Sequence, residues 1–592
     1  MCSQRLQGGE MGDQAMYQLY RNTWAELTGA GAQFEVAPAS VRGQTIKSWK
    51  NAPASVRDVW LASAAFGERD YIVYENERLT YAQTHARVNA FAAWMASQGV
   101  QPGDHVAIAM RNFPEWMQAY WATLMLGGVV VGMNAWWVPN EMAYGLNDAK
   151  PKILILDQER LDRVLPVRGE IPPVIMVGVR LNTNAAATGA NHIIDFEEAI
   201  TAGTGKPLPS PAIDPDSDAT IFYTSGTTGY PKGAQLTHRG CVSNLFSLMF
   251  AGALQAGINA KRGLVAPDAK PIIPSALVTT PLFHVTANNC AAYSITMAGG
   301  KLVHMYRWDA GEALRLIEQE RITSMSGVPT MAREVITHPD FPNRDTSSLV
   351  SLGGGGAQLQ PDLVRKIDET VATARPSTGY GMTETCGIIT SIGADYFIDK
   401  PDSCGPAMPV YETRVVDDKG NDVPRGTPGE LWVKGAQVIR GYLNRAEATA
   451  SSITDGWLHT GDMARLDDEG FIYIVDRIKD MVLRGGENVY CAEVEAAMYK
   501  HSAIAETTVF GVPDERLGEE VGAAVFLKSE ATLSAEELRD HCAVLMARHK
   551  IPKYIWFVTE PLPRNASGKF LKRELRDKFS KTLTAQVAGA IS

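Results

Sequence analysis

The chain has 592 residues, of which 45% are hydrophobic and 21% are charged, with 66 acidic against 56 basic side chains. A chain of this length exceeds one ordinary core, so we expect at least two domains. The net charge of −10 gives no overall attraction for polyanions, so we expect no nucleic-acid partner, and any phosphate ligand must be held by local donors.

The cysteines and histidines give no sign of a zinc site. Seven scattered cysteines include no C-x-x-C pair, and no H-E-x-x-H occurs among the histidines. Such cysteines suit a reducing compartment, and the N-terminus lacks the apolar core of a signal peptide, so we expect a cytoplasmic location. The most membrane-like run, residues 119–133, is too short and glycine-rich to cross a bilayer. It predicts a buried helix leading into a strand, and we expect no integral membrane segment.

Strands and helices alternate along most of the chain. Residues 1–48 predict a polar N-terminal extension with some helical periodicity, packed on the main body. From there "DYIVYENERLTYAQTHARVNAFAAWMASQGV" predicts two strands and a helix, "HVAIAM" a strand, "PEWMQAYWATLMLGG" a helix and "KILILD" a strand. Strands interleaved with helices indicate parallel βαβ units. After about Gly387 the chain is richer in short strands, and a separate αβ tail begins near Arg477.

The run "YTSGTTGYPKGAQLTH", Tyr223 to His238, crowds small residues and one lysine behind an apolar pair. Small residues let the backbone approach phosphate oxygens, while N–H groups, hydroxyls and an ammonium donate to them. The run does not match the Walker pattern, because Lys232 is followed by Gly233 and not by a hydroxyl residue. Taken alone, it indicates either a phosphate loop of another kind or an ordinary glycine-rich turn.

A second candidate site is "STGYGMTETCG", residues 377–387. Tyr380 offers a flat face for a base, Thr383 a hydroxyl donor, and Glu384 a hard oxygen of the kind that Mg²⁺ prefers. A core tyrosine in an ordinary turn would give the same letters, so this motif is weak by itself.

Two further motifs lie toward the C-terminus. In "DGWLHTGDMARLDDEGFIYIVDRIKD", Asp462 could accept hydrogen bonds from a ribose diol and Arg477 could add a charged fork. In "LPRNASGKFLKREL", Lys569 follows a glycine in a turn. Each has a plain structural alternative: a turn acid, a surface ion pair and a solvated cation. The four motifs occur in one order over about 350 residues, and each supplies a different part of an ATP·Mg²⁺ site.

With these four motifs in register, the chain resembles the adenylate-forming superfamily of acyl-CoA synthetases, adenylation domains and luciferases. The resemblance runs from about Pro53 to Leu575 and is closest in pattern to fatty-acyl-CoA synthetases. It implies an α/β fold with a large domain, residues 49–477, of layered αβ subdomains plus a β-barrel-like subdomain. It also implies a small, mobile α+β domain, residues 478–592, with the hinge near Lys479.

The resemblance also implies roles for residues of this chain. The loop that grips the β- and γ-phosphates of ATP would be Thr224, Ser225, Gly226, Thr227, Thr228, Gly229 and Lys232. The remaining ATP contacts would be Gly356 and Ala357 at the adenine edge, Tyr380 on the adenine, Thr383 at the α-phosphate, Asp462 and Arg477 on the ribose, and Glu384 on Mg²⁺. Lys569 would bridge the acyl carboxylate and the α-phosphate, and the loop with Gly485 and Gly486 would approach the site for thiolation.

Two positions depart from the usual pattern. Where the family often has Gly-Ala-Pro, this chain has Gly356-Ala357-Gln358, and Cys491 replaces a frequent proline after the thiolation loop. Neither change removes a donor that the chemistry needs, so both bear on local loop geometry.

The expected acid is bulky and apolar. Amino-acid-activating relatives place an Asp after the "PLFH"-like stretch, and "HVTANNC" has none. Gly354, Gly355 and Val328 are expected in the wall of an acyl pocket that suits a medium- or long-chain fatty acid, while an aromatic, cinnamate-like acid stays open. His284 is expected to be a wall or gate of this pocket, with a core histidine as the alternative, because an ionised acid needs no general base.

The expected reaction is ATP-dependent formation of an acyl-AMP with release of pyrophosphate, followed by transfer of the acyl group to coenzyme A. The expected partners are therefore a small carboxylic acid, ATP with Mg²⁺, and coenzyme A, and a homodimer is left open. The alternatives are a ligase that loads a separate carrier protein and a non-catalytic acyl or nucleotide sensor, while a luciferase-like oxygenase shares all the motifs.

Overall fold

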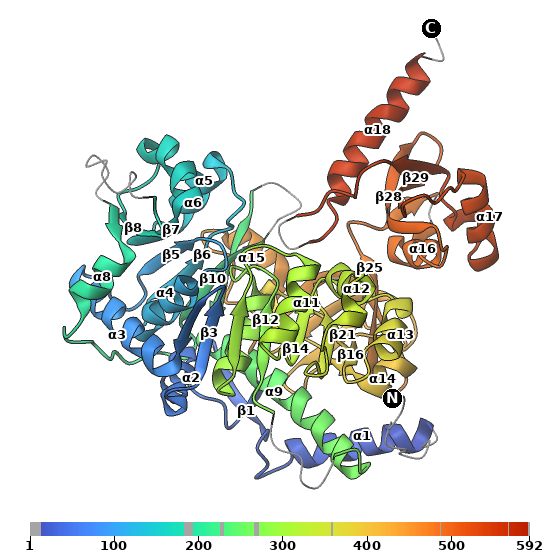
Figure 1. Cartoon of the computed structure of the whole chain (residues 1–592). Helices are drawn as coiled ribbons and strands as arrows, with labels where there is room; N and C mark the ends of the chain where they lie inside the picture. The colour runs from blue at the N-terminus through green and yellow to red at the C-terminus, as the bar shows by residue number, and fades with distance from the viewer. Residues whose placement is uncertain are drawn as a thin grey trace.

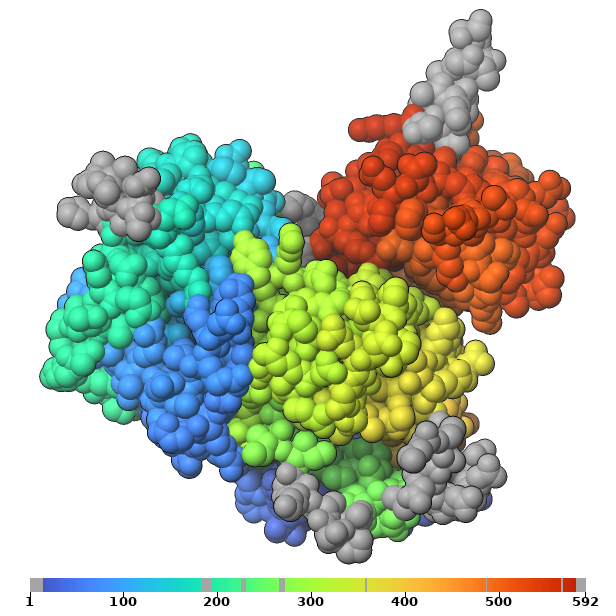
Figure 2. Space-filling model, in the orientation of Figure 1, coloured from blue at the N-terminus to red at the C-terminus, as the bar shows by residue number. Residues whose placement is uncertain are grey.

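The computed structural model describes residues 13–182, 193–224, 230–265, 272–356, 359–485, 487–565 and 568–589, and every count below refers to these residues. The C-terminal part of the chain forms a separate lobe that rests on the larger body, as Figures 1 and 2 show. The predicted α/β fold, with a large N-terminal domain and a smaller C-terminal one, is confirmed.

The first layer of the large domain is a seven-stranded sheet in the described residues. Its strands are parallel apart from the β10–β11 pair. In spatial order they are β11 (Lys232–Thr237), β10 (Asp218–Thr224), β6 (Val129–Gly132), β5 (His105–Ala109), β7 (Ile153–Asp157), β8 (Ile175–Val179) and β9 (Ile193–Asp195).

The second layer is an eight-stranded sheet in the same described part, parallel at its centre and antiparallel at both edges. Its order is β19 (Ile392–Gly393), β16 (Arg375–Thr378), β15 (Ser351–Gly354), β14 (Ser324–Gly327), β12 (Ser275–Val278), β13 (Lys301–His304), β3 (Asp70–Tyr74) and β4 (Glu77–Thr80).

Helices cover both sheets, and their starts carry recognisable caps. At α3, Thr80 accepts from the Gln83 backbone N–H while the Gln83 side chain accepts from the Thr80 N–H, a reciprocal capping box. The helices of the large domain are α2 (Val56–Ser63), α3 (Tyr81–Ser97), α4 (Pro114–Met125), α5 (Pro139–Ala149), α6 (Gln158–Val164), α8 (Phe196–Gly203), α9 (His238–Lys261), α10 (Tyr293–Met297), α11 (Ala310–Gln319), α12 (Pro329–Thr337), α13 (Pro361–Thr370), α14 (Ala394–Asp399) and α15 (Ala446–Ser452).

Helix α9 is the one helix of the described residues that is long and apolar enough to cross a membrane. In its most apolar window 56% is buried inside the protein, which is the state of a core helix. The run 119–133, which the sequence marks as membrane-like, forms the end of α4 and strand β6, both buried, as predicted.

A third sheet completes the large domain and is antiparallel throughout. The described residues give it six strands: β20 (Gly405–Pro406), β25 (Phe471–Arg477), β24 (Trp457–Leu466), β22 (Gly429–Lys434), β21 (Glu412–Val416) and β23 (Ile453–Thr454). It is the strand-rich region that the sequence indicates after Gly387.

The N-terminal extension consists of helix α1 (Asp13–Thr28) and a hairpin of β1 (Val36–Val41) and β2 (Gln44–Trp49). Helix α1 packs against α9 (Figure 1), and the ring centroids of Trp24 and Phe250 are 4.7 Å apart. In the hairpin turn, the Arg42 guanidinium donates to the carbonyls of Ile439 (2.8 Å) and Val438 (2.9 Å). The extension therefore braces the segment that follows β22.

The small domain is built on a five-stranded sheet in its described part. The strands are β27 (Glu487–Val489), β26 (Val482–Arg484), β29 (Gly518–Leu527), β28 (Ile504–Asp514) and β30 (Tyr554–Val558). The helices are α16 (Cys491–Met498), α17 (Ala535–Leu545) and α18 (Lys572–Gly589). Its core, which includes Val482, Val494 and Val525, is separate from that of the large domain.

Candidate active site

The third sheet brings together the two residues predicted to contact a ribose. Asp462 on β24 and Arg477 on β25 are register partners, and Arg477 Nε lies 3.2 Å from Asp462 Oδ1. The other carboxylate oxygen accepts a hydrogen bond from the Tyr380 hydroxyl at 2.5 Å. Burial raises the pKa of Asp462, and the nearby Arg477 guanidinium opposes that rise. Three predicted ATP contacts from two motifs thus form one cluster.

The motif around Glu384 is a tight turn that packs against the Asn244 side chain. Thr383 to Thr385 form a single 3₁₀ turn, which ends at Cys386 in the left-handed conformation (φ 55°). Gly387 follows with φ +144°, and a Cβ there would lie 2.2 Å from the Asn244 side-chain oxygen. That oxygen accepts from the Ile388 N–H at 2.8 Å. The close approach requires glycine at this point and fixes the turn that presents Thr383 and Glu384.

Tyr442 is a site residue that the sequence motifs missed. Its hydroxyl donates to Glu384 Oε1 at 2.9 Å, and the Lys232 ammonium lies 4.4 Å from the centroid of its ring. The segment that carries Tyr442 pairs with β11, because the Leu443 N–H donates to the Gly233 carbonyl at 2.8 Å. The sequence signal is an aromatic residue after the glycine in "RGYLNR", a run outside the four candidate motifs.

The glycine-rich run lies at the β10–β11 connection. Thr224 and Lys232 are the last register partners of this pair, and the Thr224 hydroxyl donates to the Lys232 carbonyl at 3.4 Å. The predicted phosphate-loop residues Ser225, Gly226, Thr227, Thr228 and Gly229 lie outside the described residues. Lys232 lies beside the ring of Tyr442, whose hydroxyl binds Glu384. The described end of the glycine-rich loop therefore lies near the proposed Mg²⁺ ligand.

Lys569 reaches this cluster from the small domain. Its Cε lies 3.5 Å from the position of a Cβ built on Gly356. Burial and the Arg477 charge lower the pKa of Lys569 to about 8, while Asp462 and Glu384 act in the opposite direction. The ammonium therefore lies among the residues predicted to hold ATP, although Arg477, the nearest of them in the sequence, is 92 positions away and belongs to a different domain.

Gly568, which precedes Lys569 in the lysine loop, also contacts the predicted wall of the acyl pocket. Gly568 has φ +80°, and a Cβ there would lie 2.8 Å from Val328 Cγ2, so only glycine fits. Val328 is buried and immediately precedes helix α12.

The glycines of the predicted wall face different surroundings. A Cβ on Gly355 would meet nothing within 4 Å, whereas one on Gly354 would lie 2.6 Å from Leu359 Cδ1. Gly355 therefore borders open space and Gly354 faces packed side chains. The neighbouring Ala357 lies outside the described residues.

His284 lies near the lysine and is held neutral. Burial, with a smaller effect from the Lys569 charge, lowers the pKa of His284 to about 4. Its Nε2 is buried and has no hydrogen-bond partner among the described residues. The centroid of this neutral ring lies 4.6 Å from that of the Phe283 ring. His284 therefore fits the role of a wall of the acyl pocket better than that of a charged contact to the substrate.

In the described part of the chain a carboxylate is available for Mg²⁺, but no preformed cluster of metal ligands is. The described residues contain no group of three or more His, Cys, Asp or Glu side chains that could hold a metal. Mg²⁺ is usually held by one or two carboxylates together with substrate phosphates and water. Glu384 fits that pattern, because the Tyr442 hydroxyl orients it and it lies near Arg477 and Lys569.

Comparison with known proteins identifies the family. Residues 60–443 match the AMP-binding enzyme family, and residues 493–569 match the AMP-binding enzyme C-terminal domain. The chain belongs to the AMP-binding enzyme family. The predicted adenylate-forming superfamily, and the prediction that the chain is an enzyme, are confirmed.

Relatives of this AMP-binding enzyme cover nearly the whole chain. A feruloyl-CoA synthase of Amycolatopsis sp is 34% identical, over 85% of this chain and 94% of its own length. A long-chain-fatty-acid–CoA ligase of Yersinia pestis is 32% identical, over 89% and 94%. The structure of an o-succinylbenzoate CoA synthetase of Bacillus subtilis, in complex with an acyl-adenylate intermediate, has a TM-score of 0.71, 29% identity, and coverage of 88% and 97%.

The predicted hinge of this AMP-binding enzyme directly follows Arg477 of the candidate site, and the Asp480 N–H donates to the Arg477 carbonyl at 3.0 Å. Lys479 is in the turn between β25 and β26, which joins the sheet of the large domain to that of the small one. The Gly485 N–H donates to the Leu517 carbonyl at 2.8 Å within the small domain, and Gly486 is outside the described residues. In this structure the small domain presents its lysine loop to the site.

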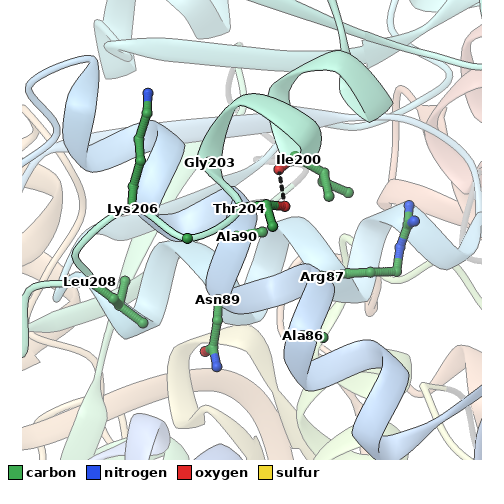
Figure 3. Close-up of a pocket in the computed structure, with 10 residues that line it drawn as sticks. Ala86, Arg87, Asn89, Ala90, Ile200, Gly203, Thr204, Lys206 and Leu208 are labelled. Atoms are coloured by element: carbon green, nitrogen blue, oxygen red, sulfur yellow. Dashed lines mark hydrogen bonds between the residues drawn. The ribbon is translucent and has the colours of Figure 1, made fainter.

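A hollow elsewhere on the AMP-binding enzyme contains none of the predicted site residues. It has a volume of about 370 Å³ and lies between α3 and α8 (Figure 3). Ala90 and Gly203 bring the two helices close together, and the Thr204 hydroxyl donates to the Ile200 carbonyl at 3.0 Å. Of the two cationic residues in its lining, Arg87 is paired with Glu197 and Lys206 donates to the Ser97 hydroxyl at 3.3 Å.

Proposed function

We propose that this AMP-binding enzyme is an ATP-dependent carboxylic acid–CoA ligase. The observation that carries the proposal is the meeting of Lys569 from the small domain with Asp462, Arg477 and Glu384 of the large domain. These groups supply a cation, ribose acceptors and a metal carboxylate in one place. Relatives named as CoA ligases of fatty and aromatic acids support the same activity.

In the first step, a carboxylate oxygen of the acid attacks the α-phosphorus of ATP, and pyrophosphate leaves. Two anions must approach each other, so the barrier falls when charge developing on the phosphorus is neutralised by fixed donors. Lys569 and the Thr383 hydroxyl are the groups of this chain proposed to do so. Mg²⁺ at Glu384 would supply further neutralisation of the phosphate charge. No general base is required, because the acid is already ionised, which agrees with a neutral His284.

In the second step, the thiolate of coenzyme A attacks the acyl carbonyl, and AMP leaves with one oxygen of the original carboxylate. Lys569 has no role in this attack and occupies the site that the thiol must reach. We therefore propose that the small domain rotates about Lys479 and exchanges the lysine loop for the Gly485–Gly486 loop.

The acid is proposed to be bulky and apolar, with a medium- or long-chain fatty acid favoured. The open space beside Gly355 and the neutral His284 support an apolar pocket, and neither offers a charge to a polar acid. A cinnamate-like aromatic acid is the second candidate, because the feruloyl-CoA synthase is as similar to this chain as the fatty-acid ligase.

We place the enzyme in the cytoplasm. The six cysteines in the described residues are all free thiols, which suits a reducing compartment. The ATP and coenzyme A that the reaction consumes are metabolites of that compartment.

A screen of acids tests the proposal. Dodecanoate, hexadecanoate, ferulate, acetate and glycine would each be incubated with ATP and Mg²⁺, and pyrophosphate release would be followed with and without coenzyme A. We expect dodecanoate or hexadecanoate to give the highest rate, with thioester formed only when coenzyme A is present. Ferulate as the best substrate would favour the aromatic alternative. Pyrophosphate release without any thioester would indicate a carrier-protein ligase, and no release with any acid would favour a sensor.

A further inference from the structure

Cys491 occupies the first turn of helix α16 and faces the hinge. Its backbone N–H donates to Asp476 Oδ2, and its Sγ donates to the Asp480 carbonyl at 3.0 Å. Asp476 precedes the hinge residue Lys479 and Asp480 follows it. The two donors of one residue therefore bind the chain on both sides of the hinge.

Cys491 and its partner Asp476 belong to different domains. Asp476 pairs with Met463 in the third sheet and is part of the large domain. Cys491 is fully buried in the core of the small domain with Val494. The bond from the Cys491 N–H to Asp476 is thus a contact between the domains, made to a carboxylate that is itself only 6% exposed.

The residue type at position 491 decides whether this contact can form. A proline at the first position of a helix has no N–H to donate and no thiol. Cysteine supplies both donors while remaining small enough for a buried position. The departure from proline noted in the sequence thus has a direct structural consequence in the hydrogen bonds at the hinge.

Asp476 accepts two backbone hydrogen bonds, although burial raises its pKa to about 6. Its second oxygen, Oδ1, accepts from the Arg477 N–H at 2.8 Å. The Lys572 ammonium of the small domain faces it and is also paired with Glu495 at 2.8 Å. Burial and the Glu495 charge act against the ionised carboxylate, whereas Lys572 and the two N–H groups favour it. A rotation of the small domain would withdraw Lys572 and the Cys491 N–H from Asp476 together.

We propose that Asp476 and Cys491 form a staple that holds the small domain in the arrangement with Lys569 in the site, and so sets the balance between the two half-reactions. This inference rests on the proposed function and adds positioning residues to it. Because the staple favours the adenylating arrangement, weakening it speeds the thiolation step relative to adenylation. Neither residue is among the groups proposed to contact a substrate, so the effect acts through the position of the small domain.

Half-reaction rates of single variants test the staple. Adenylation would be measured by acid-dependent exchange of pyrophosphate into ATP, and thiolation from synthetic dodecanoyl-AMP and coenzyme A. Cys491→Pro removes both donors, Cys491→Ala removes only the thiol, and Cys491→Ser retains both. Cys542→Ala is the matched control, because Cys542 is a buried cysteine on α17 in the core of the same domain.

We expect Cys491→Pro to raise the ratio of thiolation to adenylation by about tenfold, the order expected for loss of a hydrogen bond to a charged group. Cys491→Ala should shift the ratio by a smaller factor, and Cys491→Ser should restore the original value. Cys542→Ala should lower the melting temperature and leave the ratio unchanged. A ratio in Cys491→Pro that stays within twofold of the unaltered enzyme, or that matches Cys542→Ala, would overturn the proposal.

A second measurement separates this inference from the proposed function. Hydrogen–deuterium exchange of the peptide that spans the start of α16 requires no activity. Asp476→Ala should speed exchange of the Cys491 amide by at least tenfold in the ligand-free protein, because its acceptor is gone. Unchanged exchange would refute the staple even in an active ligase. Faster exchange in a protein that forms no thioester would support the contact and refute the ligase assignment instead.

Discussion

The buried lysine should give the two half-reactions opposite dependences on pH. Burial and Arg477 lower the pKa of Lys569 from 10.5 to about 8, so the cation is present below that pH and is lost as the pH rises through it. The proposed adenylation step needs the cation. Its kcat/KM should therefore fall tenfold per pH unit on the alkaline side, and be about thirtyfold lower near pH 9.5 than at its plateau.

Thiolation should behave in the opposite way, because it requires the thiolate of coenzyme A, which becomes more abundant as the pH rises. The assay is kcat/KM for pyrophosphate exchange between about pH 6 and 10, beside thioester formation from synthetic acyl-AMP. Lys569→Arg should remove the alkaline decline, since a guanidinium stays charged throughout. An alkaline decline that persists in Lys569→Arg, or that appears equally in thiolation, would refute the reasoning.

Three further substitutions probe other parts of the site. Glu384→Gln should cut Mg²⁺-dependent pyrophosphate release by roughly a hundredfold with an unchanged melting temperature, and near-normal release would contradict the metal assignment. Tyr442→Phe should raise the KM for Mg²⁺·ATP by about tenfold, because Glu384 loses the hydroxyl that orients it. An unaltered KM would show that this hydrogen bond does not contribute to binding of Mg²⁺·ATP. Gly355→Leu should lower activity on hexadecanoate relative to butanoate by about tenfold, since it fills apolar space. Its control, Gly354→Ala, meets Leu359 and should lower the melting temperature without changing chain-length preference.

The parts of the site that depend on short motifs could be predicted from the sequence. Asp462 and Arg477 lie in strands joined by a tight turn, so their pairing follows from local register. Thr383 and Glu384 occupy one 3₁₀ turn, and Tyr380 lies a few residues before it in the chain. The alternation of strands and helices likewise predicted the βαβ layers, because the apolar period is a local property.

Other features depend on contacts that no short motif encodes. Tyr442 meets Glu384 only because its segment pairs with β11, which lies about 200 residues earlier in the sequence. The different surroundings of Gly354 and Gly355 arise from the packing of Leu359, which adjacent glycines do not reveal. The contact of the lysine loop with Val328 belongs to the interface of two domains, and the relative position of domains cannot be read from periodicity.

The fate of one oxygen atom tests the central claim most directly. If the acid attacks the α-phosphorus of ATP, AMP must leave the acyl group carrying one oxygen from the carboxylate. The enzyme would be supplied with its best acid labelled with ¹⁸O in both carboxylate oxygens, together with ATP, Mg²⁺ and coenzyme A, and the products would be analysed by mass spectrometry. We predict a single ¹⁸O in AMP and none in pyrophosphate. Unlabelled AMP, or label in a released phosphate, would contradict the acyl-AMP route and with it the assignment of this site.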